Sequence, residues 1–284
     1  MSIVYLNGEY MKPEEAKISP MDRGFLYGDG IYEVIPNHHG KSVGLGLHLK
    51  RMENGLKEIG IEYNTEQLRE VVAHLLEANE GDDLNVYIQI SRGTYEKRFH
   101  GFPEKVEPTV FLYTWEISEA HVADKEKAHK LKVVTADDLR WQRCHIKSTS
   151  LLGNVLHFQQ SYGEGLNETL LFNEEGNLTE GSSSNAYIVK DGVLYTPPLS
   201  DELLPGITRH ILLAILREHS DIEVVERAIS KAEVFAADEI WMTSASKEVG
   251  PVVEVDGKPV GNGEIGDVWL KAQALYSKYC YDFD

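Results

Sequence analysis

The sequence is short of cysteine, of long apolar runs and of positive charge, and each shortage excludes a class of protein. Two cysteines among 284 residues do not make a disulfide framework, so we expect a reducing, cytoplasmic environment. No apolar run approaches the roughly 20 residues of a membrane-spanning helix, and no signal peptide is recognisable. Lysine and arginine number 28 against 46 acidic residues, which gives a net charge of −18. Such a surface repels phosphate backbones and anionic lipids, so we expect no nucleic-acid or membrane partner.

What is present is ordinary globular composition, with 42% apolar and 26% charged residues. The length suits one large or two medium domains. A charged, weakly periodic segment at residues 119–129 is the expected linker between a small N-terminal domain, residues 1–118, and a larger C-terminal domain, residues 130–284. Strands and helices mix in both parts. We therefore predict two α/β (α+β) domains with a cleft between them.

Local patterns place several elements well enough to locate the motifs. Asn7-Gly8 is a strong hairpin signal between two short strands. Apolar residues at helical spacing predict a helix at Leu47–Ile59, and a second helix is predicted at Thr65–Asn79 with Thr65 as its N-cap. The glycine-rich stretch Gly24–Gly30 indicates backbone held close to another segment.

One lysine stands out by its position. Lys147 follows a strand predicted at Leu131–Thr135 and precedes a helix predicted at Asn154–Ser161. A lysine at such a junction can point into a cleft, where burial penalises its charged form and leaves a nucleophilic amine that forms a Schiff base with an aldehyde. The ordinary alternative is a solvated surface lysine, because lysines are rarely buried. The surrounding motifs must decide between the two.

Two stretches decide it, Arg143-Cys144-His145-Ile146-Lys147-Ser148 and Thr179-Glu180-Gly181-Ser182-Ser183-Ser184-Asn185. Together they resemble the two signatures of the class IV, D-amino-acid-transaminase-like family of pyridoxal-phosphate enzymes. The resemblance extends from Asn7 to about Gly261 and is closest to the D-amino acid transaminase branch. It implies the two-domain pyridoxal-phosphate fold type IV, a homodimer, and pyridoxal 5′-phosphate as the cofactor.

The resemblance also assigns the cofactor contacts. Lys147 would be the catalytic residue that holds the cofactor aldehyde and moves the substrate proton, and Glu180 would keep the pyridine nitrogen protonated. Arg140 would lie near the cofactor O3′. The phosphate would be held by Arg51, Ile207, Thr208, Ser244 and Ala245. The sequence itself supports one of these contacts, because Gly206-Ile207-Thr208 begins a helix after Pro205, and helix N-termini bind anions.

The substrate site in this resemblance uses a tyrosine from the glycine-rich stretch and an Arg-x-His pair. These match Tyr32, Arg98 and His100, and Tyr87 would also line the pocket. An arginine fork beside an imidazole suits a carboxylate. The pair distinguishes the D-amino acid branch from the branched-chain branch, and in the family its loop lies at the dimer interface. No metal-ligand spacing is found among the histidines, so no metal is expected.

The resulting hypothesis is a transaminase that moves an amino group between a D-amino acid of the D-alanine or D-glutamate type and a 2-oxo acid. Other activities of the same family remain open, namely branched-chain L-amino acid transaminase, (R)-amine transaminase and aminodeoxychorismate lyase. A protein that kept the fold without catalysis is a further alternative. The complete set of Lys147, Glu180, Arg51 and Thr208 argues against this last one.

Overall fold

The computed structural model describes residues 2–284, which form two compact units. The first unit contains the chain up to Glu119 together with Ile146–Leu151 and Phe283–Asp284. The second contains Ala120–His145 and Leu152–Asp282. This division corrects the expectation that Lys147 belongs to a C-terminal domain beginning at residue 130. Its short segment joins the first unit because backbone hydrogen bonds attach it there, as described below.

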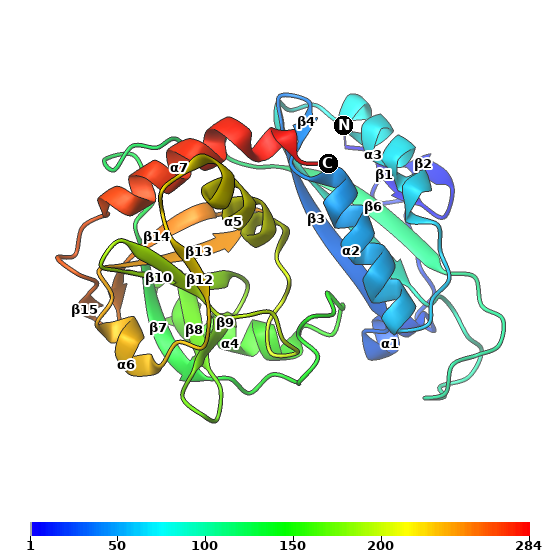
Figure 1. Ribbon diagram of the computed structural model, residues 1–284. Helices are drawn as coiled ribbons and strands as arrows, with labels where there is room; N and C mark the ends of the chain where they lie inside the picture. The colour runs from blue at the N-terminus through cyan, green and yellow to red at the C-terminus, as the bar shows by residue number, and fades with distance from the viewer. Residues whose placement is uncertain (1) are drawn as a thin grey trace. The chain divides into compact units, whose positions relative to one another are not determined.

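The first unit is built on a six-stranded antiparallel sheet with the order β2-β1-β6-β5-β3-β4 (Figure 1). Its strands are β1 (Val4–Leu6), β2 (Glu9–Met11), β3 (Gly30–His38), β4 (Lys41–Ser42), β5 (Asp83–Ser91) and β6 (Thr109–Glu116). The hairpin predicted at Asn7-Gly8 is confirmed. Both residues have positive φ, 50° and 101°, in the turn that pairs β1 with β2.

The helices of this unit are α1 (Arg23–Tyr27), α2 (Leu45–Glu58) and α3 (Leu68–Ala78), the last preceded by a 3₁₀ turn, η1 (Thr65–Gln67). The helices predicted at Leu47–Ile59 and Thr65–Asn79 are therefore confirmed, apart from the 3₁₀ opening of the second. The predicted cap is wrong by one residue. The side chain of Asn64, not Thr65, accepts the backbone hydrogen bond at this start, from Glu66 N at 3.2 Å.

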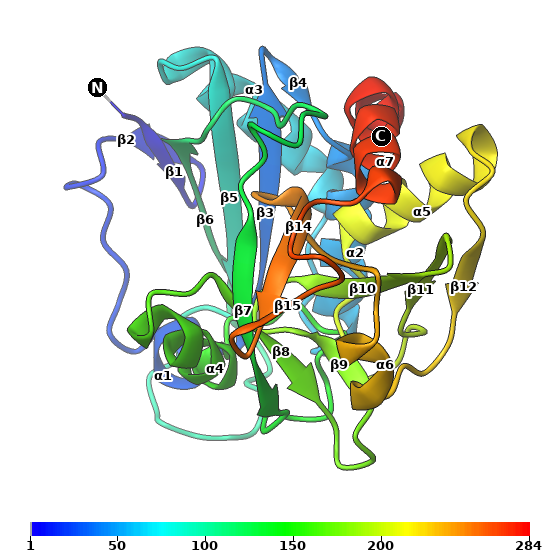
Figure 2. The same ribbon diagram turned by 90° about the vertical axis from the view of Figure 1, so that its left-hand side faces the viewer.

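The second unit contains a nine-stranded mixed sheet with the order β12-β11-β10-β13-β14-β7-β8-β9, and β15 pairs with β14 (Figure 2). Strands β7 and β8 are parallel to each other, as are β14 and β7. The strands are β7 (Leu131–Asp137), β8 (Glu168–Phe172), β9 (Leu178–Gly181), β10 (Asn185–Lys190), β11 (Val193–Thr196), β12 (Val224–Glu226), β13 (Glu239–Ser244), β14 (Glu248–Val255) and β15 (Lys258–Pro259).

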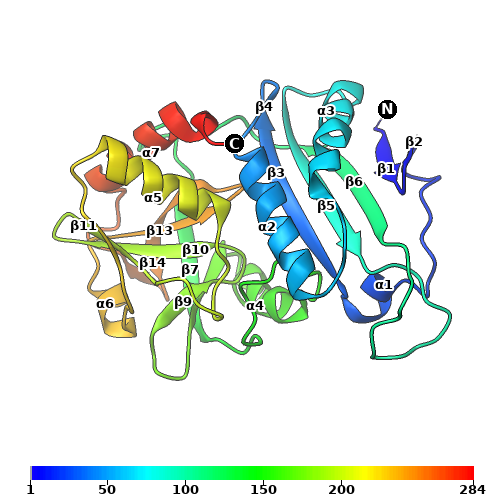
Figure 3. The same ribbon diagram turned by 45° about the vertical axis from the view of Figure 1, so that its right-hand side comes forward.

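Helices of the second unit pack against different strands of this sheet. Helices α5 (Ile207–His219) and α7 (Asp267–Tyr279) contact each other and β13 (Figure 3). Helix α4 (Leu152–Gly163) contacts β7 and β8. The remaining helices are α6 (Lys231–Phe235) and the 3₁₀ turn η2 (Cys280–Asp282). Within residues 2–284, no helix is both long enough and apolar enough to cross a bilayer.

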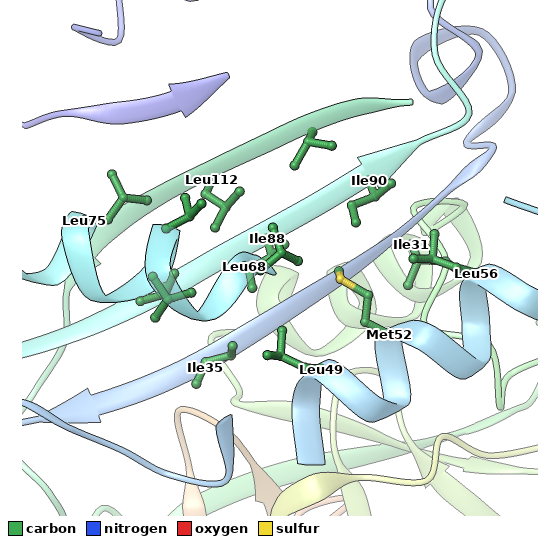
Figure 4. Close-up of a cluster of buried hydrophobic side chains, with 14 of the residues drawn as sticks. Ile31, Ile35, Leu49, Met52, Leu56, Leu68, Leu75, Ile88, Ile90 and Leu112 are labelled. Carbon is green, nitrogen blue, oxygen red and sulfur yellow. The ribbon is translucent and has the colours of Figure 1, made fainter. Parts of the chain in front are cut away.

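The core of the first unit lies between its sheet and helices α2 and α3. Alternate residues of the strands, such as Ile31, Ile35 and Ile88, point to this face, where Leu49 and Met52 of α2 pack on them (Figure 4). These side chains are 0% exposed. Since successive strand residues point to opposite faces, Tyr32 and Tyr87 lie on the other face of the sheet.

One charged side chain lies on the core face. Glu33, between Ile31 and Ile35 on β3, is 0% exposed. Its carboxylate accepts hydrogen bonds from Arg51 Nε at 2.7 Å, Arg51 Nη2 at 2.6 Å and His48 Nδ1 at 2.6 Å. Burial by itself would raise the pKa of Glu33, but Arg51 and His48 together outweigh it and lower the pKa to about 2. Burial lowers the pKa of His48, and the negative charge of Glu33 opposes that shift.

We expect Glu33→Gln to destabilise the protein at neutral pH by about 3 kcal/mol, because Arg51 would stay buried without its counter-charge. The pKa of Glu33 falls from 4.5 to about 2 on folding, so its stabilisation is complete above pH 4.5 and is lost as the pH falls towards 2. At about pH 3.5 the difference between wild type and variant should be smaller by roughly 1.4 kcal/mol.

Denaturant unfolding at several pH values, followed by circular dichroism, measures this difference. Glu62→Gln, a substitution of an exposed glutamate on the same unit, is the control and should show no such dependence. A wild-type-to-variant difference that stays constant across the acidic range would contradict the assignment.

Candidate active site

The segment Ile146–Leu151 lies alongside β3 and joins it through an isolated antiparallel bridge. The amide of Tyr32 donates to Lys147 O at 3.0 Å, and the amide of Thr149 donates to Gly30 O at 2.9 Å. Ile31 and Ser148 pair as an antiparallel bridge between these two bonds. Ile146 is 6% exposed and belongs to the apolar core of the first unit. The backbone that carries the lysine is therefore fixed on both sides of it.

The glycine-rich stretch makes room for this segment. Gly28 has φ of 66°, and a Cβ there would lie 3.0 Å from Ser150 Cα and closer still to its hydroxyl. A Cβ on Gly30 would lie 2.8 Å from Ile90 O of β5. Any larger residue would push the lysine segment or β5 away. The expectation of backbone held close to another segment at Gly24–Gly30 is confirmed.

Lys147 points to the aromatic face of the first sheet. Lys147 is half-buried, and its ammonium nitrogen lies 4.3 Å from the ring centroid of Tyr32. The ring of Tyr32 stacks on that of Tyr87 with centroids 5.7 Å apart, and burial raises the pKa of Tyr87. Lys147, Tyr32 and Tyr87 thus share one face of the sheet. Lys147 is therefore not a fully solvated surface lysine.

Arg51 is likewise not a solvated arginine on a helix surface. Its side chain is 11% exposed and forms the forked pair with Glu33 described above. Because Glu33 and Tyr32 are neighbours on β3, the fork is held next to the strand that also binds the lysine segment. The structure does not test whether Arg51 binds a phosphate, and that role stays a prediction.

In the second unit, Glu180 lies near the end of β9 and is buried, with 4% of its surface exposed. It accepts hydrogen bonds from Arg140 Nη1 at 2.5 Å, Asn185 Nδ2 at 3.1 Å and Leu204 N at 3.1 Å. Burial raises the pKa of Glu180 to about 7, and the positive charge of Arg140 opposes that rise. The result is a buried carboxyl held in one orientation by three donors.

Arg140 is itself held by a second carboxylate. Asp138 accepts from Arg140 Nε at 2.9 Å and from Nη2 at 2.7 Å, a forked pair. The hydroxyl of Thr179, which precedes Glu180, donates to the same carboxylate at 2.8 Å. The guanidinium is thus shared between Asp138 and Glu180. Its direct contact here is to the candidate acid, and a contact with a cofactor oxygen stays a prediction.

Helix α5 begins where the sequence predicted an anion site. Gly206 is its N-cap residue and offers no side chain, so no side-chain cap hydrogen bond satisfies the first turn. Ile207 and Thr208 occupy that turn, each 8% exposed. Ser244 and Ala245 lie at the end of β13, where Ser244 Oγ accepts from Lys247 N at 3.2 Å. Free N–H groups at a helix start favour an anion.

Asn185 connects these parts of the second unit. It donates to Glu180 and, at 2.8 Å, to Leu204 O in the turn before α5. A Cβ on Gly206 would collide with its side-chain oxygen, so the helix start lies directly against it. Asn185 also pairs with Thr243, the residue before Ser244. The candidate acid, the helix start and the Ser244 turn therefore meet around one side chain.

Arg98 and His100 lie elsewhere on the first unit, on the exposed loop between β5 and β6. The guanidinium carbon of Arg98 lies 5.4 Å from the ring centroid of Tyr27, and the centroid of the His100 ring lies 5.5 Å from that of the same tyrosine. In the described residues, the side chains of Arg98 and His100 both lie near Tyr27, whereas Lys147 lies over Tyr32. Their expected role at a substrate carboxylate remains a prediction.

Sequence reasoning missed four side chains that organise these sites, although two of them left a signal. Glu33 interrupts an otherwise apolar alternation on β3, and Asp138 stands two residues before Arg140 at a strand end. Glu168, which is 0% exposed, accepts from Ser183 at 2.6 Å, from Ser184 at 2.8 Å and also from Ser182. The three serines of the second motif therefore bind an internal carboxylate. Asn185 belongs to that motif, but its sequence position alone assigned it no role.

Comparison with known proteins supports the same interpretation. The family model described as amino-transferase class IV matches residues 30–255. The D-alanine aminotransferase of Staphylococcus aureus (strain COL) is 38% identical over 98% of this chain and 98% of its own length. The D-alanine aminotransferase of Bacillus licheniformis is 35% identical over 95% of this chain and 94% of its own.

Solved structures show the same architecture. The branched-chain aminotransferase of the thermophilic archaeon Thermoproteus uzoniensis, solved with norvaline, covers 99% of this chain and 95% of its own, with a TM-score of 0.86 and 26% identity. The branched-chain enzyme of Escherichia coli, at 24% identity and a TM-score of 0.85 over 96% of this chain and 92% of its own, agrees in fold. The predicted α/β fold type IV is confirmed. The chain belongs to the class IV amino-transferase family.

Proposed function

We propose that this chain is a pyridoxal-phosphate-dependent transaminase that moves an amino group between a D-amino acid and a 2-oxo acid. The observation that carries the proposal is Lys147, a half-buried residue whose amine lies over Tyr32 on fixed backbone in a class IV aminotransferase chain. The 38% full-length identity to a D-alanine aminotransferase favours D-amino acids over the branched-chain substrates of the 26%-identical structural neighbour.

The residues of the chain fit pyridoxal phosphate in chemical type. An aldehyde needs an amine, supplied by Lys147. A ring nitrogen needs a buried acid, supplied by Glu180, which is 4% exposed. A phosphate needs an uncapped helix start such as Ile207-Thr208, and cationic donors such as Arg51. When bound, the cofactor supplies a carbonyl that links to amines and a ring that accepts the electron pair released at the substrate Cα.

Each group of the chain then has a defined task. The Nζ of Lys147 takes the proton from the substrate Cα and returns it in the reverse half-reaction. The Glu180 carboxyl is held in one orientation because Arg140, Asn185 and the Leu204 amide bind it. Tyr32 and Tyr87 provide the wall beside the amine. Arg98 and His100 present donors that suit the carboxylate of the amino acid.

We infer a homodimer from two surface features. Arg98 and His100 lie exposed on the loop after β5, where a second copy could supply or receive them. Helix α4 exposes large apolar side chains, with Leu152 at 71%, Leu156 at 60% and Tyr162 at 65%. A row of exposed apolar residues is a typical interaction surface. Sedimentation of the holoenzyme measures the state, and a stable monomer with full activity would contradict the inference.

Lys147→Ala is expected to abolish both the yellow colour of the holoenzyme and its transaminase activity, because the amine that holds the cofactor is lost. Absorption spectra and an activity assay measure the two effects. Lys132→Ala, which removes an exposed lysine on β7, is the matched control and should keep both. Full activity in the Lys147 variant would end the proposal.

Glu180→Gln keeps the size of the side chain but removes its charge. We expect kcat to fall on the order of 100-fold while the cofactor stays bound, which is the scale seen when one charge-stabilising group is removed. Steady-state kinetics and the cofactor spectrum separate these effects. Glu164→Gln, at an exposed position, is the control. A variant with normal kcat would show that Glu180 has only a structural role.

A stereospecific substrate panel tests the substrate class directly. D-alanine and D-glutamate should be consumed with 2-oxoglutarate or pyruvate as acceptor, and the L-enantiomers should react much more slowly. Faster reaction of L-leucine would identify a branched-chain enzyme, and reaction of (R)-1-phenylethylamine an amine transaminase. Release of pyruvate from aminodeoxychorismate without a second oxo acid would identify a lyase.

A further inference from the structure

The exposed loop that carries Arg98 and His100 is attached to a buried arginine. Arg23, with 4% of its side chain exposed, donates from Nη1 to Phe99 O at 2.5 Å and from Nη2 to His100 O at 3.5 Å. Tyr27, four residues further along α1, contacts the side chains of Arg98 and His100. One short helix thus contacts both the backbone and the side chains of the Arg-x-His pair.

A single carboxylate orients this arginine. Asp29 accepts from Arg23 Nε at 2.8 Å and from Arg92 at 2.8 Å (Nε) and 3.0 Å (Nη2). Arg92 in turn donates to Gly60 O at 3.0 Å, and its guanidinium carbon lies 3.7 Å from the ring centroid of Phe102. Asp29 therefore fixes two guanidinium groups, and these contact the loop at residues 99, 100 and 102.

Other contacts of the loop lie near its start, where Thr94 pairs with Asp22 and Tyr95 N donates to Met21 O at 3.4 Å. Its ends are closely packed, since Gly93 has φ of 95° and a Cβ there would collide with Glu107 O. Between the two ends of the loop, the side chains of Arg98, Phe99 and Phe102 are exposed. Exposed loops move readily unless something orders them, and a shift of about 1 Å in a substrate-positioning group can cost on the order of 100-fold in rate.

We infer that Arg23, oriented by Asp29, is a positioning residue that holds Arg98 and His100 where they bind the substrate carboxylate. The positioning of the loop stands on the geometry alone. The effect on substrate binding rests on the role proposed above for Arg98 and His100. Arg23 acts through the loop backbone and does not itself touch substrate.

Arg23→Met in the holoenzyme removes both carbonyl contacts. Native-state trypsin digestion should then cleave after Lys97 or Arg98 about tenfold faster, the factor that corresponds to losing one charge-assisted hydrogen bond. KM for D-alanine should rise by a similar factor, with kcat changed less than about twofold and the cofactor spectrum unchanged. Arg69→Met, which removes a surface arginine of the same unit, is the matched control and should match wild type in each assay.

A double-mutant cycle separates positioning from general destabilisation. If Arg23 acts through Arg98, then Arg23→Met should raise KM no further in an Arg98→Ala background. If Arg23→Met does not fold, Arg23→Lys keeps the buried charge but cannot reach Asp29 and both loop carbonyls at once. The same cleavage and KM effects are then expected at smaller size.

Unchanged cleavage and KM in a folded variant would overturn the inference, as would faster cleavage with unchanged KM. Additive effects in the cycle would also overturn it. A wild-type protein without transaminase activity would instead contradict the proposed function, and the cleavage assay would still measure the loop contact.

Discussion

The proposed chemistry depends on a backbone attachment rather than on a side-chain contact. Two hydrogen bonds and one bridge fasten Ile146–Leu151 to β3. Ile146 is buried in the core, whereas the Lys147 ammonium lies over Tyr32 on the other face of the sheet. The direction of the amine is therefore set by burying its neighbour, and a one-residue slip would place the lysine in the core.

Buried ion pairs form a second organising feature. In the pairs of Glu33 with Arg51, Asp138 with Arg140, and Asp29 with Arg23, both side chains are at most 11% exposed. Such pairs contribute little net stability, since desolvation of both charges offsets their attraction. The first two are forked pairs, whose geometry is strict because a guanidinium fork fits a carboxylate in few orientations. Arg23 donates to Asp29 through Nε alone. Each pair therefore fixes the position of a candidate site group or of the loop that carries one. This positioning explains the burial of the charges better than a gain in stability does.

The sequence predicted what depends on local pattern and on motif. Apolar spacing located α2, and Asn7-Gly8 located the first hairpin. It did not predict that Lys147 joins the first unit, because that depends on backbone hydrogen bonds to a strand far away in the chain. The contact from Arg23 to the Phe99 and His100 carbonyls had no sequence signal at all. Every residue has a carbonyl oxygen, so nothing in the acceptor's identity marks it.

Asn185 explains how the second unit could hold a rigid ligand at two points. An aromatic ring bound by its nitrogen at one end and by a phosphate at the other requires a fixed separation between the two protein sites. Here the acid Glu180 and the turn before α5 are both bound by the amide of Asn185, at 3.1 and 2.8 Å. The backbone of Asn185 is also paired in β10 and β13 with Thr243. The separation of acid and helix start is thus set by one side chain on a central strand pair, which leaves neither site free to move without the other.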